Sequence, residues 1–407
     1  MSGLLEPLSH FVTSAVNRTL KMAEFLNSRN SAGAETIAKS VDEVPTAQTQ
    51  RLYKEADAKT VESSISRGHF DSVQVMRALS VIAVVLFHVA MRQRQDFPHI
   101  ALPLTYPQSL MGHAGVDLFF IISGFIITTV NWREFARPSA IRSYLAKRLI
   151  RVMPLYWLTA LPMIPLAMAN LDLKSAFGAL LLLPHYASRI NQVAWSLAYE
   201  ILFYAVFALF LVFPRRYLPV CVSAWVIMIL ASNAASGHVA WLGNFLRPLN
   251  LEFVLGITVA GLIQARVFFR RPRLLICLGL IGILAVAALK HFGPNPYPEY
   301  DGKMRALLFG VPCALLLYGA IVIECLGKTA YSKLLLLLGD ASYSIYLVHF
   351  VLIQLLMLNP LAAAIKNPIA FFLWELLVIV LVMAAGVLVH LKLEKPLLRT
   401  LKHRFIS

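Results

Sequence analysis

Long apolar runs recur along the chain from Val73 to Leu393, and several of them extend over about 20 residues with few charged positions. A helix of that length crosses the hydrocarbon region of a bilayer. The runs are continuously apolar and do not alternate with polar residues, so they are typical of spanning helices and not of the strands of a membrane β-barrel. The sequence therefore predicts an all-α, polytopic helical bundle in a lipid bilayer.

The predicted bundle has about ten transmembrane helices. We place them at residues 74–91, 114–131, 152–169, 194–213, 218–233, 249–265, 274–290, 304–325, 335–358 and 369–391. The apolar stretch near 176–184 is too short to cross, so we interpret it as a re-entrant or interfacial segment. The expected domains are an N-terminal tail over 1–73, a transmembrane domain over 74–391 and a basic tail over 392–407.

The N-terminal tail has a different pattern. From Phe11 to Leu26 the apolar residues recur at helical spacing, which is typical of a short amphipathic helix on a membrane or protein surface. Residues 31–67 are polar and mixed in charge, a composition typical of a flexible tail. We expect no cleaved signal peptide, because the first strongly apolar run is followed by further spans.

Charge and composition support a membrane location. The chain is 58% hydrophobic and 14% charged, whereas soluble proteins are about half apolar and about a quarter charged. The net charge is +16, and this positive charge lies between the apolar runs. We therefore expect no nucleic-acid partner. With the N-terminus in the cytoplasm, the loops after residue 91 and the C-terminal tail together hold 19 Lys and Arg residues on the cytoplasmic side. The loops on the other side hold eight. The positive-inside rule therefore favours cytoplasmic termini.

The four cysteines lie in or beside predicted spans and show neither CxxC nor Cys/His metal spacing. We interpret them as small apolar residues and expect no metal site.

Ionisable side chains inside the predicted spans collect toward their outer ends. A charge at membrane depth costs roughly 2.5 to 3.5 kcal/mol, so each such residue requires a partner or a function. The predicted topology places six of them at a similar depth: His88, Asp117, Glu200, Arg247, Glu252 and His349. Their shared depth favours a functional site over a set of unrelated interfacial residues.

Arg77 and His88 mark the two ends of the first predicted span. They are eleven residues apart, which returns to nearly the same helix face and separates them by roughly 16 Å along the axis. A pantetheine arm is about long enough to cover that distance. An anionic cytosolic donor could thus be held at Arg77 while its acyl group reaches His88, although a lone arginine at a helix end is also typical of a positive-inside anchor.

Five segments, in a fixed order, carry a family resemblance. They are RALSVIAVVLFHV (77–89), GVDLFFIISGFIIT (115–128), RSYLAKRLIRVMPLYWL (142–158), WSLAYEILFY (195–204) and SYSIYLVHF (342–350). Over residues 72 to 396 the chain resembles the membrane acyltransferase-3 family, whose members include bacterial O-acyltransferases of surface polysaccharides, Nod factors and some antibiotics.

The resemblance implies roles for the first three segments. Arg77 matches the residue that helps hold the acyl-CoA donor, and His88 matches the catalytic histidine. Asp117 and Ser123 belong to the second motif. Arg148 and Arg151 belong to the third and would bind the phosphates of coenzyme A, since guanidinium groups suit phosphate; ordinary positive-inside charge is the alternative.

The later segments match less specific motifs. Trp195 and Glu200 match one of them, and Tyr346 with His349 matches another. The chain departs from the common pattern in its long N-terminal extension and in the absence, after residue 407, of the extracytoplasmic hydrolase-like domain of some relatives. Binding of the acceptor would then depend on a separate protein or on the membrane part alone.

We therefore expect an O-acyltransferase of the bacterial cytoplasmic membrane that moves an acyl group, acetyl by family frequency and succinyl as runner-up, from acyl-CoA to a carbohydrate hydroxyl. Polysaccharide synthesis or export machinery is a possible partner. Neutral His88 would act as general base, with Asp117 or Glu200 orienting its ring, and an acyl-histidine intermediate is the variant. The alternatives are a transporter or flippase and a structural subunit of an export complex.

Overall fold

The computed structural model describes residues 70–98, 100, 105–167, 171–234, 245–292, 302–327 and 329–405. Within these ranges the chain forms helices and turns and no strand, so the predicted all-α class is confirmed there. The amphipathic helix predicted between Phe11 and Leu26 lies outside the described residues, as does most of the 1–73 tail.

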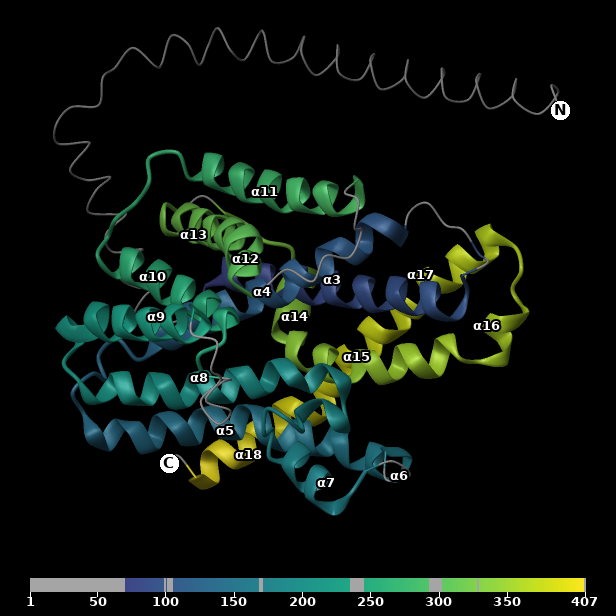
Figure 1. Ribbon diagram of the computed structural model, residues 1–407, viewed down its shortest axis with the longest axis horizontal. Coiled ribbons are helices and arrows are strands. Elements are labelled where there is room, and N and C mark those ends of the chain that lie inside the picture. The colour runs from purple at the N-terminus through teal and green to yellow at the C-terminus, as the bar shows by residue number, and fades with distance from the viewer. Residues whose placement is uncertain are drawn as a thin grey trace, which may run out of the picture. The chain divides into compact units, whose positions relative to one another are not determined.

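The helices keep the labels of Figure 1. They are α3 (Asp71–Asp96), α4 (Thr105–Val130), α5 (Pro138–Ala160), α6 (Ile164–Ala167), α7 (Leu173–Leu180), α8 (Trp195–Val212), α9 (Leu218–Ala234), α10 (Leu251–Gln264), α11 (Pro272–Phe292), α12 (Gly302–Arg305), α13 (Val311–Cys325), α14 (Lys333–Asp340), α15 (Ser342–Met357), α16 (Pro360–Ala364), α17 (Pro368–Val389) and α18 (Lys395–Phe405). Two π-helical turns, Ala306–Gly310 and His390–Glu394, join α12 to α13 and α17 to α18.

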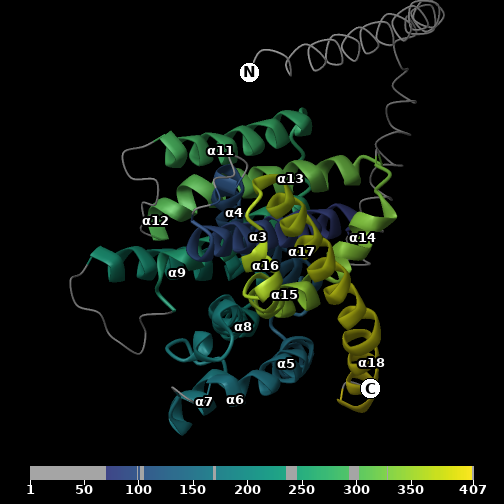
Figure 2. The same cartoon turned by 90° about the vertical axis from the view of Figure 1, so that its right-hand side faces the viewer.

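Helices α3 and α4 lie in the middle of this arrangement. Helices α11, α12 and α13 lie on one side of them, and α5, α7 and α8 lie on the other (Figures 1 and 2). The C-terminal half of α3 shares one hydrophobic core with α8 and α15, in which Val84, Phe203 and Ile345 are buried. Its N-terminal half shares a second core with α13, through Val73 and Leu317. Helix α3 thus belongs to both cores.

Glycines bring α4 and α10 into backbone contact. A Cβ atom built on Gly256 would lie 2.0 Å from the carbonyl oxygen of Ile121, and one built on Gly124 would lie 2.3 Å from that of Phe253. Small residues at helix crossings allow this approach, which supplies van der Waals packing where lipid removes the hydrophobic driving force between helices. These two glycines therefore fix the position of α4 against α10.

The N-terminus of α3 is capped by a distant carboxylate. Glu324, at the end of α13, accepts hydrogen bonds from the backbone N–H groups of Asp71 (2.9 Å) and Ser72 (2.7 Å). These groups have no partner within the helix, and a negative charge there is favoured by the helix dipole. The cap holds the first turn of α3, one turn before Arg77.

The number of spans differs from the prediction. Six described helical segments are long and apolar enough to cross a membrane, at 71–96, 192–212, 215–232, 272–289, 306–325 and 368–404. A seventh is obtained if α14 and α15, bent by 72°, form one broken span. Two further apolar helical segments, Ala114–Val130 within α4 and Pro248–Gln264, are shorter. The chain is thus a multi-pass membrane protein, but a count of about ten is not confirmed.

The predicted span 152–169 is not one continuous helix. Helix α5 begins at Pro138, continues through the basic residues around Arg148 and ends at Ala160, where a 3₁₀ turn over Leu161–Met163 follows. Hydropathy marks only the apolar half of such a helix, whereas Ala, Leu, Lys and Arg all favour helix. Helix α7 occupies part of the 176–184 stretch, and its eight residues extend only about 12 Å.

Candidate active site

A cavity of about 850 Å³ lies between α3, α4, α5, α8, α15 and α18. Residues of α4 line it from Val116 to Val130, at the three- and four-residue spacing of one helix face. Fourteen residues of helix correspond to about 21 Å. The cavity can therefore hold an elongated ligand along α4.

Basic side chains dominate the charge of this cavity. Its lining includes Arg77, Lys147, Arg148, Arg151 and Lys402. The one carboxylate among the described lining residues is that of Glu200. The Nε atom of Arg148 is buried and has no hydrogen-bond partner among the described residues. A positive cavity with an unpaired buried guanidinium donor favours an anionic ligand, and phosphate matches guanidinium geometry.

The C-terminal helix α18 forms part of the cavity wall through Leu398 and Lys402. A buried network holds the start of this helix in place. The carboxylate of Glu394 accepts a hydrogen bond from Ser344 on α15 (2.7 Å) and one from Nδ1 of His390 (2.6 Å). Helix α18 also packs against α5. The segment predicted as a basic tail therefore contributes directly to the site.

Glu200 and Ser123, which match two different motifs, are brought together inside the cavity. Oε1 of Glu200 accepts hydrogen bonds from Ser123 (3.0 Å) and from the hydroxyl of Tyr204 (2.6 Å). Arg77 lines the same cavity, and its Nη1 donates to Oε1 of Gln74 one turn earlier (3.1 Å). Both Arg77 and Glu200 are thus oriented by neighbours.

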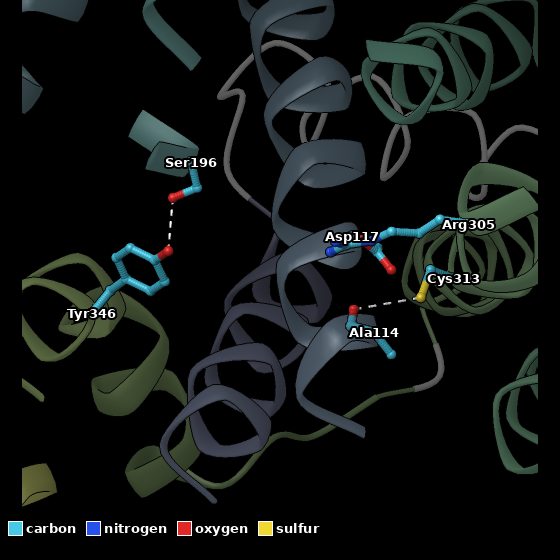
Figure 3. Close-up of polar contacts among 6 residues, drawn as sticks. All are labelled: Ala114, Asp117, Ser196, Arg305, Cys313 and Tyr346. Atoms are coloured by element: carbon cyan, nitrogen blue, oxygen red, sulfur yellow. Dashed lines mark hydrogen bonds and ion pairs between the residues drawn. The ribbon is translucent and has the colours of Figure 1, made fainter. Parts of the chain in front are cut away.

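Tyr346 and Ser196 lie next to each other on another part of the cavity lining. Their hydroxyl oxygens lie 2.7 Å apart, and the side chains point toward one another from α15 and α8 (Figure 3). The Tyr346 hydroxyl also lies 3.1 Å from the carbonyl oxygen of Val193. Phe119 of α4 contacts the tyrosine ring at a centroid distance of 6.1 Å. Tyr346 is thereby held between α4 and α8.

Two histidines meet beside Tyr346. Nε2 of His349 lies 3.2 Å from Nδ1 of His88, although 261 residues separate them. His349 is fully buried and its ring lies 5.4 Å from that of Tyr346, whereas His88 is half-buried. Neither histidine is among the described lining residues. Tyr346 therefore lies in contact with both the cavity and the histidine pair.

The predicted role of Asp117 or Glu200 in orienting His88 is not what the structure shows. Among the described residues, the ring nitrogens of His88 contact His349 and the carbonyl oxygen of Val84, the latter at 2.9 Å. Glu200 instead faces the cavity. The side chain of Asp117 contacts Arg305, at the end of α12.

Asp117 belongs to a separate buried charge cluster. Its Oδ1 accepts a hydrogen bond from Nε of Arg305 (2.8 Å) and forms an ion pair with Nη2 (2.6 Å), and Figure 3 shows the two side chains lying close to each other. The carboxyl of Glu252 lies beside that of Asp117, and both acidic side chains are fully buried. Two carboxyl groups and one guanidinium are thus enclosed among α4, α10 and α12.

Aromatic side chains lie between this cluster and an exposed arginine. The guanidinium of Arg305 lies 6.0 Å from the ring of Trp195, and the rings of Trp195 and Tyr199 are also 6.0 Å apart. Arg247 is exposed and lies beside the side chain of Tyr199. Three predicted site residues therefore lie in one neighbourhood: Trp195, Arg247 and Glu252. None of them is among the contacts described for His88.

Three residues of these sites were missed by reasoning from the sequence. Arg305 lies inside the predicted span 304–325, so its charge at membrane depth was a usable signal. Lys147 stands directly before Arg148 in the basic segment of α5. Lys402 lies near the end of the chain, and no local pattern distinguishes it from the other basic residues there.

Comparison with known proteins gives this geometry a context. A family model described as an acyltransferase domain matches residues 70–391. The exopolysaccharide production protein ExoZ of Rhizobium meliloti is 30% identical over 340 residues, covering 79% of this chain and 97% of the relative. The acyltransferase MdmB of Streptomyces mycarofaciens is 26% identical over 373 residues, covering 82% and 92%.

A third relative is longer. The O-acetyltransferase OatA of Staphylococcus aureus is 24% identical over 342 residues, which cover 73% of this chain and 53% of the relative. No solved structure matches the chain. The family model extends over more than half of the chain, including both histidines and four of the five basic cavity residues. The chain therefore belongs to the acyltransferase-3 family and is an acyltransferase.

Proposed function

We propose that this protein transfers an acetyl group from cytosolic acetyl-CoA to a hydroxyl group of an exported or surface carbohydrate, in a bacterial cytoplasmic membrane. One observation carries the proposal. A cavity lined by five basic side chains extends along α4 and is bordered by Tyr346, whose ring contacts the His88–His349 pair through His349. The residues suited to anion binding and the candidate base, His88, thus lie near each other.

The basic residues account for the donor. Coenzyme A carries several phosphate charges, and guanidinium groups bind phosphate through paired hydrogen bonds. Arg148, with its unpaired buried Nε, and Arg151 are the candidates for this role, supported by Lys147 and Lys402. The pantetheine arm would extend along α4 past Arg77, and the thioester would lie near Tyr346. The length of the lining face, about 21 Å, suits such an arm.

His88 accounts for the chemistry. The acyl group passes Tyr346 to meet His88, whose Nε2 removes the proton from the acceptor hydroxyl as that oxygen attacks the thioester carbonyl carbon. A C–O bond forms and the C–S bond breaks. The departing thiolate takes the proton from the His88 imidazolium, which leaves free coenzyme A, an ester and a neutral histidine. No other reactant is needed.

The acceptor is assigned from two sources. The names of two relatives refer to exopolysaccharide production and to O-acetyl transfer. Trp195 and Tyr199 offer aromatic faces of the kind on which sugar rings pack, beside the exposed Arg247. Polar groups that fix orientation next to aromatic surface are typical of small-molecule sites.

The direct test uses the purified full chain in liposomes with radiolabelled acetyl-CoA and polysaccharide from cells that lack the protein. We expect alkali-labile label in the polysaccharide and one free thiol for each ester. Acetyl phosphate, which lacks the nucleotide and the arm, is the control donor and should be inactive. Equal transfer from acetyl phosphate, or redistribution of polysaccharide across the bilayer without ester formation, would contradict the proposal.

A further inference from the structure

The two histidines differ in their surroundings. His349 is fully buried and its Nδ1 lies 2.6 Å from the carbonyl oxygen of Tyr346, in its own helix. His88 is half-buried, with Nδ1 2.9 Å from the carbonyl oxygen of Val84, also in its own helix. Each ring is therefore anchored by a backbone carbonyl on Nδ1. The remaining contact joins Nε2 of His349 to Nδ1 of His88 at 3.2 Å.

These contacts determine where the ring hydrogens lie. A carbonyl oxygen only accepts, so Nδ1 must carry a hydrogen in both rings. Nε2 of His349 therefore faces an N–H group of His88, and it must be the acceptor of that bond. His349 is consequently neutral, with a hydrogen on Nδ1 and a lone pair on Nε2. His88 is left with its hydrogen on Nδ1, and its lone pair is on Nε2.

We propose that His349 is the positioning residue of the transfer reaction: it fixes the tautomer and the orientation of His88, so that Nε2 of His88 is the base. The inference rests on the proposed function. In hydrolytic triads a carboxylate plays this part by accepting the hydrogen bond from Nδ1 of the catalytic histidine. Here a neutral imidazole is the acceptor, and it places no fixed negative charge beside the base in the apolar interior.

The arrangement also explains how His88 can carry a proton during the reaction. When Nε2 of His88 takes the hydroxyl proton, its Nδ1–H group remains directed at two acceptors, the Val84 carbonyl and Nε2 of His349. Hydrogen bonds from a cationic donor are stronger than those between neutral groups. The imidazolium is therefore stabilised relative to the neutral ring, as the transition state requires.

Three substitutions at one position separate positioning from packing. In His349→Gln the side-chain oxygen can reach the place of Nε2 and accept from His88. In His349→Asn the amide can satisfy the Tyr346 carbonyl but is too short to reach His88. His349→Leu removes both contacts. Each variant is reconstituted in liposomes and assayed with acetyl-CoA after its amount and thermal unfolding midpoint have been measured.

We expect His349→Leu and His349→Asn to lower kcat by a hundredfold or more with little change in KM for acetyl-CoA, and His349→Gln to recover most of the loss. That split is expected for a group that acts on the transition state and not on donor binding. The inference is overturned if His349→Leu keeps normal kcat, or if Gln and Asn lose activity equally and in proportion to lost stability. His88→Ala is assayed in parallel: if it keeps normal activity, the proposed function itself fails, whereas an inactive His88→Ala with a normal His349→Leu removes only the role of His349.

Discussion

Arg305 binds Asp117 through two nitrogens, Nε at 2.8 Å and Nη2 at 2.6 Å, across 188 residues of sequence. The carboxylate is fully buried and the guanidinium side chain is 16% exposed. Removing one partner of such a pair leaves an uncompensated charge in the apolar interior. The acidic residue of the GVDLFF segment is thus paired with an arginine that no motif identified.

We predict that Arg305→Ala lowers the free energy of unfolding by about 3 to 5 kcal/mol. Thermal unfolding of the purified protein in detergent measures the change. Arg247→Ala, which removes an exposed arginine of the same neighbourhood, is the matched control and should shift stability by about 0.5 kcal/mol or less. Equal midpoints for the two variants would show that the Asp117–Arg305 pair contributes little.

Lys402 is predicted to act on donor binding. Because it is exposed at the cavity wall, Lys402→Ala should raise KM for acetyl-CoA about two- to fivefold at low salt, with kcat unchanged. The effect should shrink in concentrated salt, which screens exposed charges. Lys395→Ala changes a basic residue of the same helix that does not line the cavity, and it should leave KM as it is. A Lys402→Ala enzyme with normal KM at low salt would exclude this contact.

The packing of α4 on α10 gives a matched pair of glycine substitutions. Gly256→Ala places a methyl group 2.0 Å from the carbonyl oxygen of Ile121, which forces the helices apart. Gly261 lies five residues later in the same helix, and a Cβ atom there meets nothing within 4 Å. Gly261→Ala should therefore raise helix stability by about 0.5 to 1 kcal/mol, and Gly256→Ala should lower the unfolding midpoint. If both substitutions shifted the unfolding midpoint in the same direction, the close approach of α4 and α10 would be contradicted.

Trp195 tests the acceptor side. We expect Trp195→Ala to raise KM for the polysaccharide at least tenfold and to leave KM for acetyl-CoA unchanged, since its ring lies with Tyr199 and not among the lining residues of the cavity. Trp195→Phe keeps an aromatic face and should recover most of the affinity. If the two Michaelis constants changed together, Trp195 would not be specific to the acceptor.

The sequence predicts the helical class better than it predicts how the helices and the candidate site residues are arranged. Hydropathy placed His88 and His349 at one depth, and the structure joins them. It could not separate Asp117 from His88, because depth gives no information about which side of α4 a residue faces. The length of α5 and the 72° bend between α14 and α15 were missed for a related reason: an apolar run marks where a helix contacts lipid and not where it begins or bends.

The central claim is that Nε2 of His88 is the base that activates the acceptor hydroxyl, and turnover of His88→Ala tests it most directly. The variant is compared with the unaltered protein in liposomes, at matched amounts and with matched thermal midpoints, with acetyl-CoA and polysaccharide both in excess. Loss of a general base costs about 10²- to 10⁴-fold, so we predict kcat at least a hundredfold lower with KM for acetyl-CoA within about twofold of normal. Ester formation by His88→Ala at the normal rate would contradict the account.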